Sequence, residues 1–554
     1  MRRTPLPANL ASRSQGVPHS DRHYPRAGLL PIALLPMLAV VLAACGSSVP
    51  GPSGGSPVAS QHGLATAGPA TSAGLTAPTQ SASGTPHGAT RFPLAVVTGL
   101  TNLKDAVTVA ELAQLGGSGR IFAPCDVTIV QPAELTVTGG SCLPADQIAS
   151  RIAGEPGAIG LLPPGLVEVK TKVLPVDGAD LFGSAQARTR AYPIIGTSTV
   201  LPPAATSYDP ASIRTLMSVG ESCPDRGVAQ QAITLGRGWG WVFGGGTARY
   251  LDIRPNPAPP GHVGNGFNVA DIQPTGNAGA VWKMIGAADF TVEDFECPVV
   301  NNWRVNEGLS FGIDPRVLGY MKRGGTDTVI LANNHQTDQG IGGLLESLGH
   351  FADAGILEAG AGRDLAQALA PAVYDAHGLK FAVVGWNIVP GVVAAGPNQP
   401  GVAWMTDANI RESVRLARAA GDVVVCMPQW GFPEYHVALQ PEDRAIQQQL
   451  IDAGCDVILG HGPHWAGEID LFRRPDGGVL FSIYGHGNFL FGQDWAQESQ
   501  EGLLPELTFN GTRLVNVRLH PYAMYLQAQA NLTDPQGDGR YVLRRVLGVS
   551  RLAY

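Results

Sequence analysis

The chain has 554 residues, of which 71 are glycine and 44 are proline, and charged residues make up 15%. A uniformly disordered chain is excluded, because disordered segments are poor in apolar residues and 44% of this chain is hydrophobic. A membrane protein with several spans is also excluded, since a single apolar run approaches the length of a spanning helix. The net charge of −8 argues against nucleic acid as the main partner, because phosphate binding needs a basic face.

The N-terminus has the pattern of an export signal. Five arginines precede an apolar run from Leu29 to Ala44, and its length of about 16 residues is short for a spanning helix and suits a signal peptide. The run ends in Leu42-Ala43-Ala44-Cys45, which resembles the lipobox of bacterial lipoproteins. We expect residues 1–44 to be a signal peptide and Cys45 to carry a lipid on the extracytoplasmic face of the cell membrane. A cleaved signal followed by a chance cysteine is the alternative.

Residues 45–90 are predicted to form a flexible linker. Between Gly46 and Thr90 the sequence has no Asp, Glu, Lys or Arg, and small residues and proline dominate. Such a segment has too little apolar surface to offset its chain entropy. A lipid anchor, a linker and a folded body form the layout expected of a protein held at a membrane surface.

The first folded region is predicted over residues 91–203 as a small α/β module. Its stretch 155–162, followed by 173–178 and by Tyr192-Pro193-Ile194, resembles the C-terminal part of phosphate-type periplasmic binding proteins. The region is too short for the whole two-lobed fold, so we expect a partial module that serves interaction. A receptor for phosphate or another small anion is the less favoured alternative.

The second folded region is predicted over residues 212–525, where apolar runs alternate with helical patterns as in βα units. Asp314-Pro315 is a helix start signal, and Gly324-Gly325 ends that helix. The further predicted strands are 327–332, 381–385, 422–426, 456–459 and 479–484, and the further predicted helices are 341–353, 407–420 and 441–453. Residues 526–554 are expected to form a C-terminal extension.

Six cysteines lie in the two folded regions. The candidate disulfide partners are Cys125 with Cys142 and Cys223 with Cys297. An oxidising compartment permits such bonds, although one sequence leaves the pairing open. Cys426 and Cys455 lie in strongly apolar runs and are predicted to be buried thiols.

Polar side chains follow the carboxyl ends of the predicted strands of the second region. In chain order they are Asn333, Asn334, His335, Asp338, Gln429, Glu434, His461, His464, His486 and Asn488. Strand ends of a layered α/β fold converge on one edge, where ligands bind. Histidines, amides and carboxylates together have the composition of a divalent-metal site, which activates water and polarises a phosphoryl or acyl oxygen. Each motif alone also suits a turn with a structural histidine.

Six motifs occur in one order along this region. They are Met217–Glu221 with Arg226, Ala288–Val292 with Asp294–Glu296, Leu331–His335 with Asp338 and Gly340, Gln429–Gly431 with Glu434 and Tyr435, Leu450–His464, and Tyr484–Phe489. Their order and spacing resemble the CapA family of poly-γ-glutamate capsule-synthesis proteins, which are related to calcineurin-like metallophosphatases. The resemblance covers roughly residues 212–525.

The resemblance implies an α/β fold, a calcineurin-like metallophosphatase α/β/β/α sandwich with the site at one edge, here joined to the smaller N-terminal module. The implied metal ligands are Glu221, Glu296, His461, His464, Gln429 and His486. His335 is implied as a general acid, Asn334 as a contact to metal or substrate, and Arg226 as a contact to an anionic substrate. The implied cofactor is Mn, Mg or Zn, or none if the site is degenerate.

Several positions depart from the family pattern. Glu221 replaces an aspartate, Asp294 an asparagine, Gln429 a histidine and Gly462 a histidine. An amide oxygen is a weaker ligand than imidazole for zinc-like metals. His486 replaces an apolar residue and is a candidate substitute ligand.

Two functions from different classes are therefore expected. The first is a metal-dependent hydrolase or transferase that acts on an anionic surface polymer or its precursor. The second is a non-catalytic binding or scaffold subunit of a polymer synthesis or export complex, together with other capsule-synthesis membrane proteins. Nucleic acid is not an expected partner of either.

Overall fold

The computed structural model describes residues 88–137, 141–251, 271–306, 308–431, 434–494 and 496–553. These residues belong to one compact unit, 82–554. The predicted signal peptide, Cys45 and nearly all of the predicted linker lie outside the described residues. Within those ranges, no helix is both long and apolar enough to cross a membrane.

The N-terminal module is an α/β structure with two small sheets. Its strands are β1 Thr90–Pro93, β2 Ala95–Gly99, β3 Ile121–Pro124, β4 Thr128–Gln131, β5 Cys142–Leu143, β6 Ile159–Leu162, β7 Thr171–Val173 and β8 Ile195–Ser198. Its helices are α1 Val109–Gly117, α2 Ala145–Ala153, α3 Ala185–Arg188 and α4 Pro203–Thr206. The larger sheet is mixed, with the order β5-β3-β6-β2-β7, and the smaller one has the order β1-β8-β4.

The main domain begins at β9 and is built around two larger sheets. Its strands are β9 Ile213–Cys223, β10 Thr247–Tyr250, β11 Ile272–Gly276, β12 Phe290–Phe295, β13 Thr328–Ile330, β14 Leu357–Ala359, β15 Ala361–Gly362, β16 Ala372–Ala376, β17 Leu379–Asn387, β18 Gly401–Val402, β19 Val423–Gln429, β20 Val457–Leu459, β21 Ile469–Arg473, β22 Val479–Ile483, β23 Asn488–Phe491, β24 Glu501–Asn510, β25 Arg513–Tyr525 and β26 Gln529–Thr533. Its helices are α5 Arg226–Ala229, α6 Trp239–Val242, α7 Ala280–Ile285, α8 Arg316–Gly324, α9 Gly340–Ala354, α10 Leu365–Leu369, α11 Asp407–Ala420, α12 Pro441–Ala453 and α13 Arg540–Leu547.

The two sheets carry parallel strands in their centres. The ten-stranded sheet has the order β11-β10-β26-β25-β24-β9-β12-β13-β14, with β23 also paired to β9, and the six-stranded sheet has the order β16-β17-β19-β20-β22-β21. Strands β9, β12, β13 and β14 run parallel, as do β17, β19, β20 and β22. Because parallel strands end at the same edge, their following loops gather there.

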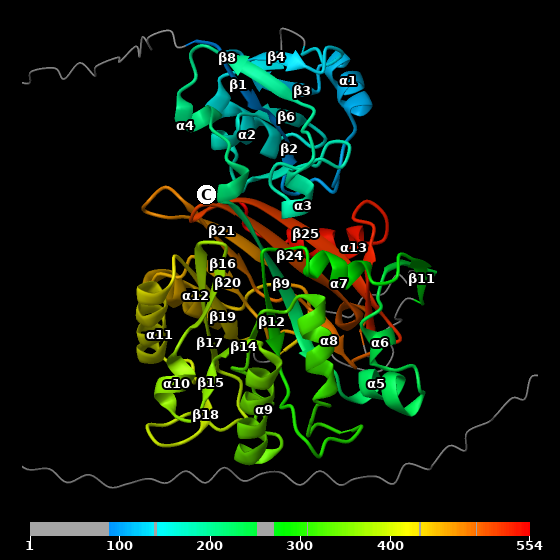
Figure 1. Ribbon diagram of the computed structural model, residues 1–554, viewed down its shortest axis with the longest axis vertical. Helices are drawn as coiled ribbons and strands as arrows, with labels where there is room; N and C mark the ends of the chain where they lie inside the picture. The colour runs from blue at the N-terminus through cyan, green and yellow to red at the C-terminus, as the bar shows by residue number, and fades with distance from the viewer. Residues whose placement is uncertain are drawn as a thin grey trace, which may run out of the picture. The chain divides into compact units, whose positions relative to one another are not determined.

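The layers of the main domain follow from its apolar cores. Side chains of the two sheets meet in one core, in which the rings of Phe290 and Phe381 stack with their centroids 5.1 Å apart. The outer face of the ten-stranded sheet packs against α7, α8 and α9, and that of the six-stranded sheet against α10, α11 and α12 (Figure 1). The layer order is therefore helix, sheet, sheet, helix, and the predicted α/β class is confirmed.

Local sequence signals predict most helix boundaries to within a few residues of those in the structure. The predicted helices 407–420 and 441–453 have the bounds of α11 and α12. The hydroxyl of Thr406 accepts the capping hydrogen bond of α11. The helix predicted to start at Asp314 begins at Arg316 instead, with the Asp314 carboxylate accepting from its main-chain N–H at 3.0 Å.

Residues 526–553, which cover the predicted C-terminal extension, form part of the main domain. β26 lies between β10 and β25 in the ten-stranded sheet, and α13 buries Leu543 in the core between the sheets. The turn between β25 and β26 has Leu526 and Gln527 at φ values of 53° and 58°. Glycine or asparagine usually signals such a turn. Neither is present here, so the sequence does not predict the hairpin.

Three disulfides cross-link the described residues. They join Cys125 to Cys142, Cys223 to Cys297 and Cys426 to Cys455. The prediction of buried thiols at Cys426 and Cys455 is wrong. Helix α12 returns the chain so that Cys455 lies beside β19, with 5.9 Å between the two Cα atoms, and an apolar surrounding does not prevent a bond at that distance.

Glu293 of β12 is a buried carboxyl that points away from the site described below. Its oxygens accept hydrogen bonds from Ser222 Oγ at 2.6 Å and Thr326 Oγ1 at 3.0 Å. Burial, which these hydroxyls offset in part, raises the pKa of Glu293 to about 7. The folded protein therefore keeps this proton to a higher pH than the unfolded chain does.

Glu293→Gln is expected to be as stable as the wild type at low pH and more stable at pH 8. Below the ordinary pKa of 4.5 the carboxyl is protonated in both states. As the pH rises to about 7, the wild type loses ~3 kcal/mol of unfolding free energy relative to the variant. Glutamine keeps both contacts because hydroxyl groups donate or accept. Urea denaturation at pH 4.5 and at pH 8 measures the difference in unfolding free energy between the variant and the wild type. The same difference at both pH values would contradict the expectation.

Candidate metal centre

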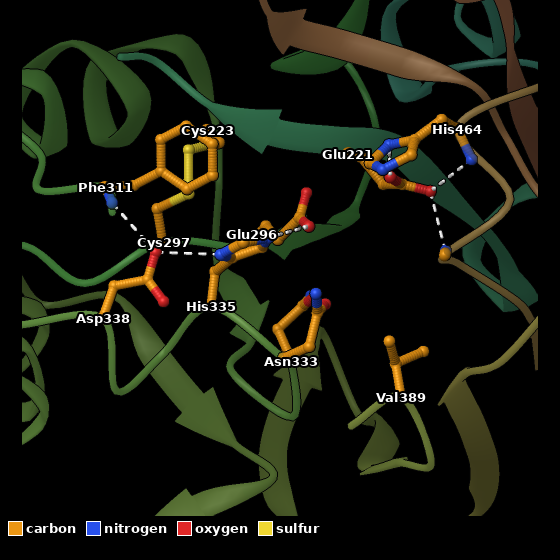
Figure 2. A network of polar contacts seen from close by, with 12 residues as sticks. Glu221, Cys223, Glu296, Cys297, Phe311, Asn333, His335, Asp338, Val389 and His464 are labelled. Carbon is orange, nitrogen blue, oxygen red and sulfur yellow. Dashed lines mark hydrogen bonds and ion pairs between the residues drawn. A yellow bond between two sulfur atoms is a disulfide. The ribbon is translucent and has the colours of Figure 1, made fainter. Parts of the chain in front are cut away.

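Glu221, Glu296 and His464 place one donor atom each within 4.8 Å of one another. Glu221 lies near the end of β9, Glu296 directly follows β12, and His464 lies in the loop after β20. The ten-stranded sheet thus supplies both carboxylates and the six-stranded sheet supplies the imidazole. All three residues are buried, and Figure 2 shows them together with His335.

Glu221 and His464 form a buried ion pair. Glu221 Oε2 lies 2.5 Å from His464 Nδ1, and Glu221 Oε1 accepts from the main-chain N–H of Gly462 at 2.7 Å and of His464 at 3.3 Å. Burial opposes the charge of Glu221, but the adjacent imidazolium and these donors hold its pKa below the ordinary value. Burial likewise opposes the charge of His464, and Glu221 raises the pKa of His464 well above its usual range.

Gly462 explains one departure from the family pattern. Its φ is 104°, and a Cβ at this position would lie 2.1 Å from the carbonyl oxygen of Trp430. A side chain is therefore excluded by backbone conformation and by space. The main-chain N–H of Gly462 instead binds the Glu221 carboxylate.

Glu296 has an oxygen that the protein leaves without a hydrogen bond. Its Oε2 is buried and has no partner among the described residues, while its Oε1 lies 3.9 Å from His335 Nε2. Burial raises the pKa of Glu296 to about 7, with His464 and His335 opposing the shift. A buried, unpaired carboxylate oxygen beside two further donors fits a bound cation.

A second group of unpaired polar atoms lies next to this cluster. Asp294 accepts from Asn333 Nδ2 at 2.8 Å through Oδ1, whereas its Oδ2 lies 3.9 Å from His461 Nδ1. Asp294 Oδ2, both ring nitrogens of His461 and Gln429 Oε1 have no hydrogen-bond partner among the described residues. Burial raises the pKa of Asp294 well above its ordinary value and lowers the pKa of His461 well below its ordinary value. Such a concentration of unpaired buried atoms is rare unless a ligand satisfies them.

His486 lies behind His461, with the two rings stacked at 4.9 Å. Its Nδ1 lies 3.1 Å from the carbonyl oxygen of Gly460 and its Nε2 lies 2.8 Å from Ser218 Oγ. The carbonyl can only accept, so Nδ1 carries the hydrogen and Nε2 accepts from the hydroxyl. Burial lowers the pKa of His486 to about 4. Both nitrogens are thus engaged within the protein, and His486 positions His461.

His335 is oriented by Asp338 at the edge of the cluster (Figure 2). Its Nδ1 lies 2.8 Å from Asp338 Oδ2, which also accepts from the main-chain N–H of Phe311 at 2.9 Å. The imidazole packs edge-on against the ring of Phe311. Burial opposes its charge, but the bond to Asp338 and the proximity of Glu296 raise the pKa of His335. The ring therefore presents Nε2, a proton donor when charged, toward Glu296.

Arg226 is held over two aromatic rings beside the cluster. Its guanidinium carbon lies 5.0 Å from the ring centroid of Phe311 and 5.4 Å from that of Phe491. Arg226 has a φ of 43°, and the Asp225 carboxylate accepts from its main-chain N–H and from that of Gly312. The cation is therefore fixed at the site, as an anion-binding residue requires.

A disulfide lies directly behind the two carboxylates. Cys223 follows Glu221 by two residues, Cys297 directly follows Glu296, and the two sulfurs are bonded. Both cysteines are buried. The bond therefore ties the end of β9 to the end of β12, where the candidate ligands project.

Known proteins share these motifs. A family model described as "Bacterial capsule synthesis protein PGA_cap" matches residues 215–493, which is half of the chain. The chain belongs to the PGA_cap family. This confirms the resemblance seen in the motifs, and the matched residues include every candidate ligand named above.

Curated members of the family are similar over part of their length. The chain is 28% identical to "Capsule biosynthesis protein CapA" of Bacillus anthracis over 42% of this chain and 57% of that protein. It is 30% identical to "PGA biosynthesis protein CapA" of Bacillus subtilis over 42% of this chain and 61% of that protein. The chain thus spans about three fifths of the length of the curated relatives that it matches.

Solved structures are similar at low identity. A hypothetical protein from Thermus thermophilus matches with 13% identity and a TM-score of 0.28, over 44% of this chain and 91% of that one. A putative 5'-nucleotidase from Staphylococcus aureus matches with 10% identity and a TM-score of 0.26, over 46% of this chain and 49% of that one.

The structure groups the PGA_cap motif residues more finely than the sequence did. Glu221, Glu296 and His464 meet in one cluster, whereas His461 and Gln429 lie with Asp294. Gln429 Nε2 donates to Asn334 Oδ1 at 3.3 Å, which fixes the amide of Asn334. Asp294, which replaces a family asparagine, also belongs to this second group. Its signal was the spacing of two from Glu296, which places both carboxylates on one side of an extended strand.

Two aromatic residues were missed altogether. The rings of Phe311 and Phe491 both pack against the guanidinium of Arg226, and Phe311 also packs on His335. Neither belongs to a polar motif, so only their positions in space reveal the role.

Proposed function

We propose that this protein is a divalent-metal-dependent hydrolase or transferase acting on an anionic surface polymer of the poly-γ-glutamate type, or on its phosphorylated or γ-glutamyl precursor. The observation that carries the proposal is the buried cluster of Glu221, Glu296 and His464, in which Glu296 has an unpaired oxygen. The names of the PGA_cap relatives support a role in polymer assembly.

The donor set fits a divalent cation. Two carboxylates and an imidazole suit Mn²⁺ or Zn²⁺, and carboxylates suit Mg²⁺. A cation held there would polarise a phosphoryl or acyl oxygen of the substrate. The helix–sheet–sheet–helix order of the main domain supports the finer assignment of its fold as a calcineurin-like metallophosphatase sandwich.

The remaining site residues have roles that follow from their contacts. Arg226 binds an anionic group of the substrate, because its planar guanidinium is fixed against two rings. His335 donates a proton from Nε2 to the leaving group, since Asp338 engages Nδ1. The amide nitrogen of Asn334 contacts the substrate, because its oxygen accepts from Gln429.

The proposal places the protein on the extracytoplasmic face of the cell membrane, anchored by a lipid on Cys45. The apolar run Leu29–Ala44 and the uncharged segment after it support this location. Other membrane proteins of capsule synthesis are the proposed partners. Recovery of wild-type protein, and not of Cys45→Ser, in the membrane fraction is the result expected.

Hydrolysis assays on the purified full chain test the catalytic role. With Mn²⁺ present, we expect release of product from a phosphoester or a γ-glutamyl peptide, and loss of that activity on chelation. His335→Ala should lower kcat by about 10²–10⁴ while the cation still binds, and His350→Ala, on the outer helix α9, should leave kcat unchanged.

If the wild type binds the cation but is inactive on all of these substrates, the proposed catalytic role is contradicted. The replacement of a family histidine by Gln429 favours, in that event, the second function, a binding subunit of a polymer synthesis or export complex. Polymer production that survives His335→Ala but fails without the protein would point the same way.

A further inference from the structure

A second cavity lies between the N-terminal module and the main domain, and none of its lining residues belongs to the candidate metal centre. Its volume is about 130 Å³. Its apolar walls include Leu100 and Leu103 after β2, Leu519 on β25, and Leu543 and Leu547 on α13. Apolar cavities of about this size admit a molecule such as benzene, so the apolar part of this space suits a small organic molecule.

Lys172 of β7 is a buried cation in the wall of this cavity, with 8% of its surface exposed. Its ammonium donates one hydrogen bond, to the main-chain carbonyl of Asn102 at 2.6 Å. An ammonium has three donors. Among the described residues no carboxylate lies within 4.0 Å of it, and Asp105, which also lines the cavity, is exposed and farther away.

The other basic residues of the cavity are already paired. Arg518 Nη1 lies 2.5 Å from Asp180 Oδ2, and its Nη2 donates to the carbonyl of Val173 at 2.9 Å. His520 Nε2 lies 2.8 Å from Glu506 Oε2. Lys172 is thus the one of these basic residues that forms no ion pair within 4.0 Å among the described residues, and Asp105 acts on its charge from farther away.

A buried charge with no carboxylate in direct contact is costly. Burial lowers the pKa of Lys172 to about 8; Asp105 offsets this shift and Arg518 adds to it. The charged form is therefore retained at neutral pH, in apolar surroundings that strengthen its attraction for an anion. A pocket with mostly apolar walls and a few polar groups is the usual form of a small-molecule site.

We propose that this cavity binds a small organic carboxylate, whose carboxylate pairs with Lys172 and whose apolar body lies against Leu103, Leu519 and Leu543. Because β7 belongs to the module and β25 and α13 to the main domain, an occupant contacts both. The site is separate from the metal centre and does not depend on its chemistry.

Calorimetric titration of the full chain with hexanoate tests the proposal. Wild-type protein should bind hexanoate, and Lys172→Met, which keeps the length of the side chain, should bind it at least about tenfold more weakly. Lys170→Met is the matched control, because Lys170 lies two residues away and pairs with Glu168. It should bind hexanoate like the wild type.

Two further comparisons separate the charge from the shape of the cavity. Hexylammonium, with the same chain and the opposite charge, should not bind, and butyl phosphate should bind more weakly than hexanoate. Leu547→Phe, which fills the cavity and keeps Lys172, should also weaken hexanoate binding. Affinity should fall as the pH rises above about 8, since Lys172 loses its proton there; Asp105, Arg518 and His520 are the other titratable or charged groups that line the cavity.

Several results would overturn the proposal. They are the absence of hexanoate binding to the wild type, equal binding by Lys172→Met, equal binding of hexylammonium, and tighter binding of butyl phosphate than of hexanoate. Titration with Mn²⁺ in the same preparation reports on the metal centre, so failure at one site is distinguished from failure at the other.

Discussion

Glu296→Gln is expected to abolish binding of a divalent cation without destabilising the protein in the absence of the cation. Glu296 Oε2 has no hydrogen bond among the described residues, and its Oε1 lies 3.9 Å from the nearest charged partner, His335. The substitution therefore breaks no strong internal contact. It removes a charged ligand oxygen, and a neutral amide oxygen binds a cation more weakly.

Glu221→Gln should lose both cation binding and stability. Its carboxylate is 2.5 Å from His464 Nδ1 and accepts from two main-chain N–H groups. Removal of the charge takes away the nearest counter-charge of the buried His464 imidazolium and leaves it Glu434 at 3.7 Å, which costs ~3 kcal/mol of unfolding free energy. Both glutamates belong to the candidate metal centre, yet they differ in their other contacts.

Calorimetric titration with Mn²⁺ and urea denaturation with a chelator measure the two effects. Glu293→Gln is the matched control, because it changes the same residue type on the same strand and its side chain contacts Ser222 and Thr326 instead. It should bind Mn²⁺ like the wild type. Retention of full Mn²⁺ affinity by Glu296→Gln would remove Glu296 from the ligand set.

The double substitution Cys223→Ser with Cys297→Ser should have the second-largest effect. The bond joins residues 74 apart in sequence. In the chain-entropy model, its loss raises the conformational entropy of the unfolded chain and so lowers the free energy of unfolding by ~4 kcal/mol. Loss of the disulfide also removes the covalent link between the ends of β9 and β12, beside Glu221 and Glu296. We therefore expect lower stability together with weaker cation binding.

The Cys125–Cys142 bond in the N-terminal module provides the control. Its partners are 17 residues apart, so serines at both positions should cost less, ~3 kcal/mol, and should leave Mn²⁺ affinity unchanged. Urea denaturation without reductant and Mn²⁺ titration apply to both variants. Equal cation affinity in the wild type and the Cys223/Cys297 variant would show that strand pairing alone positions the carboxylates.

Signals that act over a few residues were readable from the sequence. The helix 441–453 begins with a proline and ends before Gly454, whose φ is 105°, and these residues mark a helix start and stop by themselves. The strand 456–459 and the histidines after it were placed in the same way. Polar residues after apolar runs therefore predicted the α/β class and the edge that carries the site.

Contacts between distant residues needed the folded chain. Glu221 and Gly462 are 241 positions apart, and no local pattern states that the end of β9 meets the loop after β20. The same holds for the bond between Cys426 and Cys455, for β26, whose turn lacks glycine, and for the split of the ligands into two groups.

The polar motifs and their places after strands can be read from the sequence, because helix caps and alternating burial depend on neighbours in the chain. The tertiary structure alone decided which of them meet. It paired Glu221 with His464 and left one oxygen of Glu296 without a hydrogen bond, and it buried Lys172 with a main-chain carbonyl as its hydrogen-bond acceptor. The burial of these side chains and the distances between them set their charges. Both arise only when the sheets and the module pack together.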